Sequence, residues 1–480
     1  MTIRALNHAI ASRFRELARI DSAAWRSALI SASVTAFGAG VRRPAACHRR
    51  QQACESGFRP SRPATMNDDN DPGNCRALRL RQPTTTTGEI YMKVGASLFF
   101  PNQSDWPRFL AGERGEKVPG RPAKPDHEVW SENLKAARLV DQLGYDSLWT
   151  IEHRVAPYAM TPNPVQTLSY WAGALEQVDL GSMVIVLPWH NPLRVAEELV
   201  VLDNMLAGTG RSVSIGLGRG AARREFDALG LDMNESRQRF NESVEIIKRA
   251  LTTDRFSYEG EIFTYDNVEL RPQARDGQRI VDHLYCAAGS PSTVPIAAGY
   301  GLKPLIIPQR PYPAYVDELR RWGDFTAGAG FEPARPRVSV WFYCAATETE
   351  AREAAAKHMS EFSQSSIANY ELNGDHFNNI KGYEHYATEA TVIREAEARG
   401  EDPLTEHFLA EHCWGTPEMC YERLKKINEL LHTEEIVLQV FYGTMSYQQF
   451  KDSVSLFARE ALPAAKDLPL YEPLRSGVMA

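Results

Sequence analysis

His153 is the residue of this sequence whose type and position best suit acid–base chemistry. It follows a short apolar run at 147–151, which has the length and composition of a buried strand. Histidine exchanges protons near neutral pH, so a histidine at the carboxyl end of a strand is a natural proton donor or acceptor. A lone histidine after a strand is also common as a packing residue. We therefore treat His153 as a candidate catalytic residue whose role depends on the fold around it.

A second group of residues is suited to binding phosphate. Arg219 stands between Gly218 and Gly220 after the apolar run at 213–217, where glycine allows close approach of the backbone and a guanidinium can bind phosphate oxygens. The next run, 283–287, leads into small and hydroxyl residues at the expected start of a helix, namely Ala288, Gly289, Ser290 and Thr293. Each feature alone is also typical of an ordinary turn or helix cap. Together they predict a phosphate clamp built from two adjacent strands.

These residues recur at the ends of apolar runs because the chain alternates such runs with longer amphipathic stretches. Eight runs are expected to be strands, at 94–100, 147–151, 180–187, 213–217, 283–287, 304–307, 337–344 and 435–441. Eight strand–helix units favour a closed (β/α)₈ TIM barrel over an open doubly wound sheet, and barrel chemistry lies at the carboxyl ends of the strands. A hairpin is expected at 256–270. The polar segment 369–412 reads as an irregular rim insertion, a candidate lid over the pocket.

Composition excludes several classes of protein. The chain has 54 basic and 61 acidic residues and a net charge of −7, which argues against a nucleic-acid-binding surface. No apolar run reaches the roughly 20 residues of a membrane-spanning helix. Seven cysteines in 480 residues, without a C-x-x-C pair, favour a reducing compartment, so we expect a cytoplasmic protein. The histidines of the insert lack the spacing of a helical metal site, and no metal is predicted.

The first 91 residues differ in composition from the rest of the chain. They contain 14 arginines, no lysine and 7 acidic residues, a net charge of +7, whereas 92–480 carries −14. Little periodicity is present, and we expect this arginine-rich extension to be largely disordered. It could be a targeting segment, a binding tail or an upstream translation product that does not belong to the working protein. The functional barrel is expected to occupy 92–480 and to begin at Met92.

Several stretches resemble the bacterial-luciferase-like flavin-dependent monooxygenases. They read "MKVGASLFF" from Met92, "GYDSLWTIEHRV" from Gly144, "LGSMVIVLPWHNPLRVAEELVVLDNM" from Leu180, "EFDALGLDMNESRQRF" from Glu225 and "WGTPEMCYERL" from Trp414. The resemblance covers about 92–463, and the long string that starts at Leu180 is highly specific. It implies a (β/α)₈ barrel that binds FMN or, in a sister branch, a deazaflavin.

The resemblance also assigns roles to particular residues. It implies that His153 is the catalytic histidine and that Arg219, Ser290 and Thr293 contact the flavin phosphate, with Ala288 and Gly289 in the same cofactor-binding turn. Met183 and Val184 match a pair that forms a cis peptide beneath the flavin ring in some members. Gly218 stands where light-emitting members have cysteine, so ordinary oxygenation is expected rather than bioluminescence. Trp149 and Trp189 are candidates for the apolar pocket wall.

The implied reaction uses reduced FMN and dioxygen to oxygenate a small apolar substrate through a peroxyflavin. A separate NAD(P)H-dependent flavin reductase would supply the reduced FMN. The stretch 164–206 resembles the pairing helices of the family and predicts a homodimer, although its apolar stripe could instead pack on the barrel. Two alternatives stay open, a deazaflavin-dependent oxidoreductase on the same barrel and a non-catalytic flavin-binding subunit.

Overall fold

The computed structural model describes residues 91–287, 292–400 and 403–477. These residues lie within one compact unit of the chain, Pro83–Ala480. The expected disorder of the arginine-rich extension concerns residues outside this description, apart from Tyr91. Ala288, Gly289 and Ser290 of the predicted phosphate clamp also lie outside the described residues.

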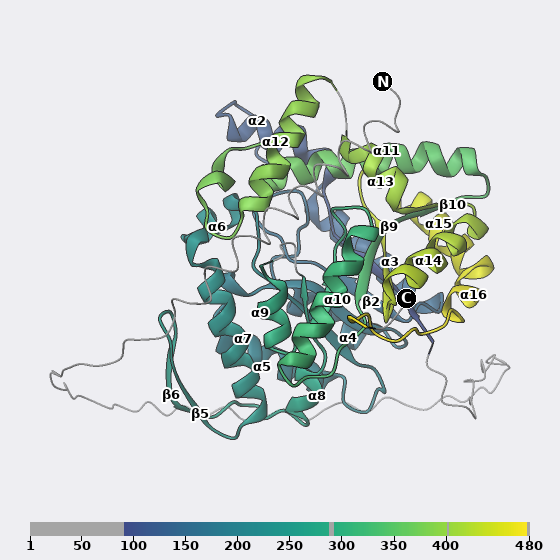
Figure 1. The fold of residues 1–480 in the computed structure, drawn as a ribbon. Helices are drawn as coiled ribbons and strands as arrows, with labels where there is room; N and C mark the ends of the chain where they lie inside the picture. Colours follow the sequence, from purple (N-terminus) through teal and green to yellow (C-terminus); the bar gives the residue numbers. More distant parts are fainter. Residues whose placement is uncertain (1–90, 288–291, 401–402, 478–480) are drawn as a thin grey trace, which may run out of the picture. The chain divides into compact units, whose positions relative to one another are not determined.

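Eight parallel strands close into a barrel (Figure 1). Around the barrel the order is β1, β2, β3, β4, β7, β8, β9 and β11, and β11 pairs with β1 to complete the ring. This confirms the predicted (β/α)₈ barrel, and each strand falls on one of the eight predicted runs. The strands are β1 (Lys93–Leu98), β2 (Ser147–Thr150), β3 (Asp179–Val186), β4 (Val213–Gly218), β7 (Leu284–Ala287), β8 (Lys303–Ile306), β9 (Arg337–Cys344) and β11 (Glu435–Phe441).

Helices on the outside of the barrel connect successive strands. Several begin at sequence signals that satisfy the free N–H groups of a first turn. Asn163 and Asn191, for example, each precede a proline and accept backbone N–H bonds with their side chains. The helices that follow the eight strands are α3 (Asp126–Gln142), α4 (Pro164–Ala174), α5 (Pro192–Met205), α7 (Ser236–Thr252), α9 (Val294–Gly299), α10 (Pro313–Gly328), α14 (Pro417–Leu431) and α15 (Tyr447–Glu460).

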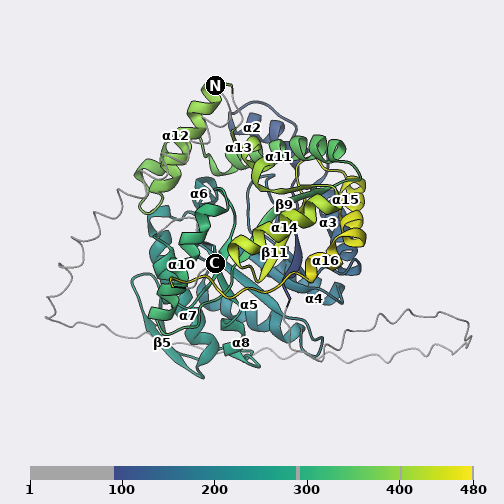
Figure 2. The ribbon, with the colours of Figure 1, turned by 45° about the vertical axis from the view of Figure 1, so that its right-hand side comes forward.

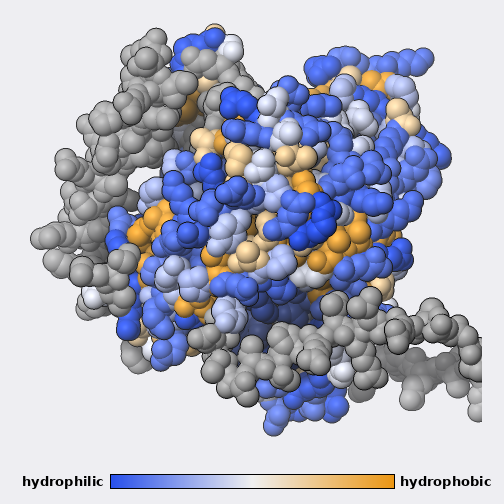
Figure 3. All heavy atoms as spheres, turned by 90° about the vertical axis from the view of Figure 1, so that its right-hand side faces the viewer, coloured by the Kyte–Doolittle hydropathy of each residue, from blue (hydrophilic) through white to orange (hydrophobic). Residues whose placement is uncertain are grey.

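Several smaller strands and helices are added to the eight strand–helix units. The predicted hairpin is present as the antiparallel pair β5 (Phe256–Glu259) and β6 (Thr264–Val268). The others are α2 (Trp106–Glu113), α6 (Arg223–Leu229), α8 (Gly277–Val281), β10 (Cys413–Gly415) and α16 (Leu462–Lys466). On the face in Figure 3, hydrophilic side chains predominate and hydrophobic ones form separate patches. Within the described residues, no helix is both long enough and apolar enough to cross a membrane.

The insert between β9 and α14 is helical, which corrects the expectation of an irregular segment. Helix α11 (Glu348–Tyr370) extends into the expected segment, and α12 (Glu384–Ala398) and α13 (Pro403–Glu411) follow it. Alanine and glutamate are frequent in α12, and both favour helix, so composition outweighed the polar character that suggested a loop. Figures 1 and 2 show these helices gathered with α2 and α6 at one end of the barrel.

Buried charges occupy the opposite, amino-terminal end of the barrel. Arg337 at the start of β9 lies 3.1 Å from Glu435 and 3.1 Å from Glu434 at the start of β11. The indole nitrogen of Trp149 donates to Glu435 over 3.1 Å, and the Ser147 hydroxyl donates to the same carboxylate. These contacts place Trp149 in the barrel core. The proposal that it lines the pocket was therefore wrong, because its ring points to the end away from His153.

Glu434 should make the stability of the barrel depend on pH. Burial alone would raise the pKa of Glu434, but the charge and hydrogen bond of Arg337 outweigh burial and hold the pKa at about 2. A lowered carboxyl pKa stabilises the fold above its unfolded value of about 4.5, and this contribution is lost as pH falls toward 2. The side chain is 30% exposed, so we expect about 1 kcal/mol from it. In urea titrations, the stability difference between wild type and Glu434→Gln should shrink from pH 6 to pH 3. A constant difference would contradict this account.

Candidate active site

His153 lies just beyond the carboxyl end of β2 and is held on both ring nitrogens. Its Nδ1 is 2.9 Å from Oε1 of Glu225, and its Nε2 is 2.9 Å from the hydroxyl of Tyr370. Glu225, in α6, is fully buried, and the same carboxylate oxygen accepts the backbone N–H of Arg154 over 3.0 Å. His153 itself is 8% exposed. The predicted candidate is thus an oriented histidine paired with a carboxylate, the arrangement that proton transfer requires.

Glu152 precedes His153 but serves a different part of the rim. Its carboxylate accepts the backbone N–H of Val186 over 2.8 Å and lies 2.7 Å from Nε2 of His190. The Arg154 guanidinium also donates to Glu152 and stacks 4.9 Å from the ring centre of Trp189. The two neighbouring side chains therefore diverge, as the alternation of a strand predicts. Glu152 braces the ends of β2 and β3, while His153 faces α6 and α11.

The carboxyl-terminal parts of β3 and β4 approach each other closely. The Met183–Val184 peptide bond is cis. A Cβ atom placed on Gly218 would lie 2.5 Å from Cγ2 of Val184, which is closer than any side-chain contact allows. Gly218 therefore has a steric reason to be glycine, because Val184 already fills the space that a cysteine side chain would need.

Two guanidinium groups lie beyond the end of β4. Nη2 of Arg219 donates to the backbone oxygen of Gly382 in the insert over 2.7 Å, and its guanidinium stacks 4.5 Å from the ring centre of Tyr383. Nη2 of Arg237, in the first turn of α7, donates to the hydroxyl of Thr293 over 3.1 Å. Nη1 of each arginine is buried and has no hydrogen-bond acceptor among the described residues.

The electrostatics of this arginine pair favour an anion. Burial, followed by the positive charge of Arg219, lowers the pKa of Arg237 to about 10. Neither guanidinium forms a carboxylate ion pair within the described part of the chain, whereas the buried Arg337 and the partly buried Arg310 each do. Burying two like charges together is costly unless a ligand compensates them. A phosphate group, with its charge and several acceptor oxygens, suits both free N–H groups.

The insert covers this region with an apolar cluster of its own. Phe377 and Tyr383 of the insert pack with Val186 and Trp189 at the end of β3 and with Phe226 of α6. The Tyr383 hydroxyl donates to the backbone oxygen of Gly220 over 2.7 Å. These contacts agree with the expectation that the insert is a lid, and they place Trp189 among the residues that the lid covers.

Among the predicted site residues that the structure describes, Arg219 and Thr293 are linked through Arg237, and Gly218 lies against Val184 of the Met183–Val184 cis peptide. His153 is held by Glu225 and Tyr370. Sequence reasoning missed Glu225, Arg237 and Tyr370. Only Arg237 carried a usable signal, since a cation in the first turn of a helix opposes the helix dipole and needs an anion nearby.

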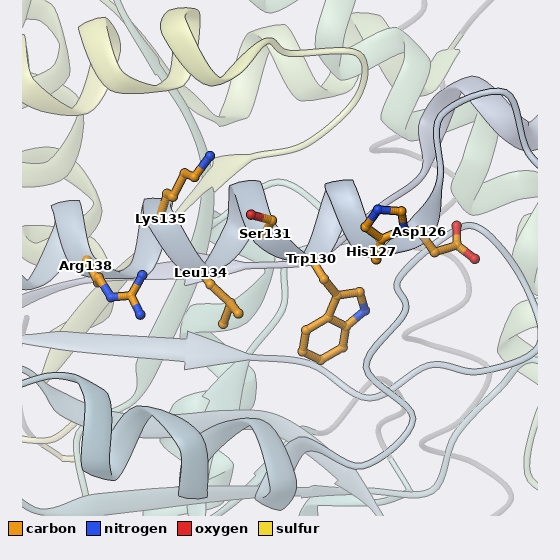
Figure 4. A pocket seen from close by; sticks show the side chains of 7 residues that line it. All are labelled: Asp126, His127, Trp130, Ser131, Leu134, Lys135 and Arg138. Atoms are coloured by element: carbon orange, nitrogen blue, oxygen red, sulfur yellow. The ribbon is translucent and has the colours of Figure 1, made fainter.

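A groove on the surface of the molecule does not belong to this site. A groove of about 510 Å³ runs along the outer face of α3, lined by seven of its residues between Asp126 and Arg138 (Figure 4). All of these side chains come from that outer helix, and none contacts His153 or Arg219. No group of three or more potential metal ligands occurs among the residues that the structure describes.

Known proteins resemble this chain in sequence. The alkanal monooxygenase alpha chain of Photorhabdus luminescens is 31% identical over 182 residues, 38% of this chain and 48% of that protein. The oxygenase component of the flavin-dependent trigonelline monooxygenase of Acinetobacter baylyi is 24% identical over 328 residues, 67% of this chain and 82% of that protein. The first of these alignments thus spans about half of the relative's own length.

Solved structures share the fold. Monooxygenase RslO1 from Streptomyces bottropensis aligns with a TM-score of 0.61 at 24% identity, over 78% of this chain and 99% of that one. The oxygenating constituent of 3,6-diketocamphane monooxygenase from Pseudomonas putida, in complex with FMN, gives 0.57 at 20%, with the same coverage. An F420-dependent secondary alcohol dehydrogenase gives 0.56 at 15%, over 79% and 100%.

A family model described as luciferase-like monooxygenase matches residues 109–434, which include β2 to β9, the insert, His153, Arg219 and Arg237. The match covers well over half of the chain. The chain therefore belongs to the luciferase-like monooxygenase family.

Proposed function

We propose that this protein is a flavin-dependent monooxygenase that uses reduced FMN and dioxygen to oxygenate a small apolar substrate. The observation that carries the proposal is the partly buried pair Arg219 and Arg237, each with a buried N–H group that has no acceptor among the described residues. The pair follows the carboxyl end of β4, and His153 follows the carboxyl end of β2, on the same rim of the barrel. An anion site and an acid–base group on one rim, both beneath a lid, suit a phosphate-bearing cofactor whose chemistry must be kept dry.

Bound reduced flavin would supply the electrons that activate dioxygen. For their part, Arg219, Arg237 and Thr293 would hold the phosphate, with Ser290 predicted beside them. Val184 and Gly218 would face the ring. His153 would take or give the proton that oxygenation requires. The insert, through Tyr383 and Phe377, would exclude water from the pocket.

FMN is the cofactor that we propose, and a deazaflavin is the runner-up. The arginine pair suits a terminal phosphate, which FMN carries, and a structurally similar protein is titled as an FMN complex. The same fold also serves an F420-dependent enzyme. A non-catalytic flavin-binding subunit is the third reading. The oriented histidine favours an enzyme over it, because a pure binding protein has no need of a carboxylate–histidine pair.

We also propose that a separate NAD(P)H-dependent reductase delivers the reduced FMN. One relative is named an oxygenase component, which implies a partner of this kind for that protein. For the compartment, we keep the prediction from the cysteine content, which is a cytoplasmic location.

Rapid mixing of protein and reduced FMN with oxygenated buffer tests the proposal. The expected result is transient accumulation of the predicted peroxyflavin and, with a medium-chain aldehyde as probe, oxygen incorporation measured by mass spectrometry with ¹⁸O₂. Oxidation of FMN at the rate of free FMN would refute the monooxygenase. Tight binding and turnover of a reduced deazaflavin, without oxygen consumption, would establish the runner-up instead.

The predicted homodimer now rests on different residues. The stripe Val195, Leu199 and Leu202 of α5 is buried within the chain, so it packs on the barrel. Tyr170 of α4 and Met205 of α5 are instead 47% and 50% exposed. Paired burial of these two helices against a second copy should give a dimer at micromolar concentration by light scattering, weakened by Met205→Glu. A monomeric wild type would contradict the prediction.

A further inference from the structure

The two hydrogen bonds of His153 fix the position of its proton. An ionised carboxylate can only accept, so the contact with Glu225 places the hydrogen of a neutral ring on Nδ1. Nε2 is then an acceptor, and the Tyr370 hydroxyl donates to it. In this structure the basic nitrogen of His153 is thus covered by a phenol from the insert helix α11 and does not itself open into the pocket.

Exposure falls steadily along this chain of three side chains. Tyr370 is partly exposed, His153 is 8% exposed and Glu225 is fully buried. Tyr370 also packs against both the main core and the apolar cluster of the lid. Burial raises the pKa of Tyr370 well above its usual value, so the phenol keeps its proton at neutral pH. Of the three side chains, the most exposed is therefore Tyr370, whose hydroxyl is protonated.

A second tyrosine holds the geometry. The Tyr158 ring packs edge-on against His153, with ring centres 4.8 Å apart, and edge-on against Tyr370, with ring centres 5.7 Å apart. Its hydroxyl pairs with Ser366 of α11 over 3.1 Å. Both rings of the His153–Tyr370 pair are thus kept in planes that preserve their hydrogen bond.

We propose that Tyr370 is a second catalytic residue, which exchanges the proton with the substrate while His153 and Glu225 act behind it. When the site acts as a base, the Tyr370 oxygen accepts the substrate proton and its own hydrogen passes to Nε2 of His153. The phenol stays neutral, one N–H bond forms, and the resulting imidazolium lies beside the Glu225 carboxylate. The reverse sequence delivers a proton. This inference rests on the proposed function and deepens it.

Tyr370→Phe tests the inference because it keeps the ring and removes only the hydroxyl. We expect FMN affinity within about threefold of wild type and turnover of the aldehyde probe lowered at least about tenfold, since acid–base groups contribute ~10²–10⁴-fold. Tyr145→Phe is the matched control. It removes another buried hydroxyl, which bonds to the backbone oxygen of Val454 over 3.2 Å, away from the site.

A second measurement needs neither flavin nor turnover. In ¹⁵N NMR spectra of histidine-labelled, flavin-free protein, the Nε2 signal of His153 should move in Tyr370→Phe and stay unchanged in Tyr145→Phe. Turnover within twofold of wild type would overturn the proposal even if this signal moves, because the hydroxyl would then only hold His153. An unmoved Nε2 signal would also overturn it. If wild type itself failed to oxygenate the probe, the proposed function would fail, while the NMR result would still decide whether the hydrogen-bonded relay exists.

Discussion

Replacing His153 with alanine should lower turnover at least about 100-fold and change the dissociation constant of FMN by no more than about threefold. His153 is paired with both a buried carboxylate and a tyrosine, and general acid–base groups contribute ~10²–10⁴-fold. It makes no contact with the arginine pair, so phosphate binding should survive. Oxygen should still be consumed, with hydrogen peroxide as the main product.

His127→Ala is the control, because this histidine is exposed on the outer face of α3. Single-turnover measurements with reduced FMN separate the two quantities, since binding is read before oxygen is added. Loss of FMN binding in His153→Ala would make His153 a structural residue. Unchanged turnover would transfer the acid–base role to another group of the rim.

Replacing either Arg219 or Arg237 should weaken FMN binding by about 1.5–3 kcal/mol, the range of a charge-assisted hydrogen bond, or roughly 10- to 150-fold. Arg237→Ala is the cleaner variant, because Arg219 also supports the insert through Gly382 and Tyr383. Riboflavin has no phosphate, so its affinity should hardly change. Isothermal titration with both flavins gives the comparison.

Arg239→Ala is matched to Arg237→Ala. It lies two residues further along α7 and pairs with Glu235 over 2.7 Å, so it already has its counter-ion. We expect its FMN affinity to equal that of wild type. Equal losses for FMN and riboflavin in Arg237→Ala would show that the arginine supports the fold of the pocket and does not bind phosphate.

The strands and their terminal residues could be predicted from the sequence because both depend on local patterns. Parallel strands buried on both faces read as short apolar runs, and the residue after each run falls on the same rim of the barrel. His153 and Arg219 were found in this way. The cis peptide at Met183 could be expected only from resemblance, since nothing in two apolar residues favours it.

The partners of these residues could not be predicted, because they depend on how distant segments meet. Glu225 is 72 residues from His153 and Tyr370 is 217 residues away, so their contacts follow from tertiary packing and leave no trace in local spacing. The insert was misjudged for a related reason. Its polar residues suggested a loop, but helices on a rim can be polar on one side and bury residues such as Ile393 of α12 and Phe408 of α13 on the other.

Arg219 has one further consequence, which concerns the order of events during catalysis. Its guanidinium touches the insert on one side, through Gly382, and offers a free N–H on the other. A bound anion would relieve the repulsion between Arg219 and Arg237 beneath the insert, so cofactor capture and closure become a single linked equilibrium. By thermodynamic reciprocity, any change that favours the open position of the insert must weaken the binding of the cofactor. A reduced flavin without phosphate should then leave the insert open, and its electrons should be lost to dioxygen as hydrogen peroxide. The phosphate would thus couple closure of the insert to the presence of the cofactor.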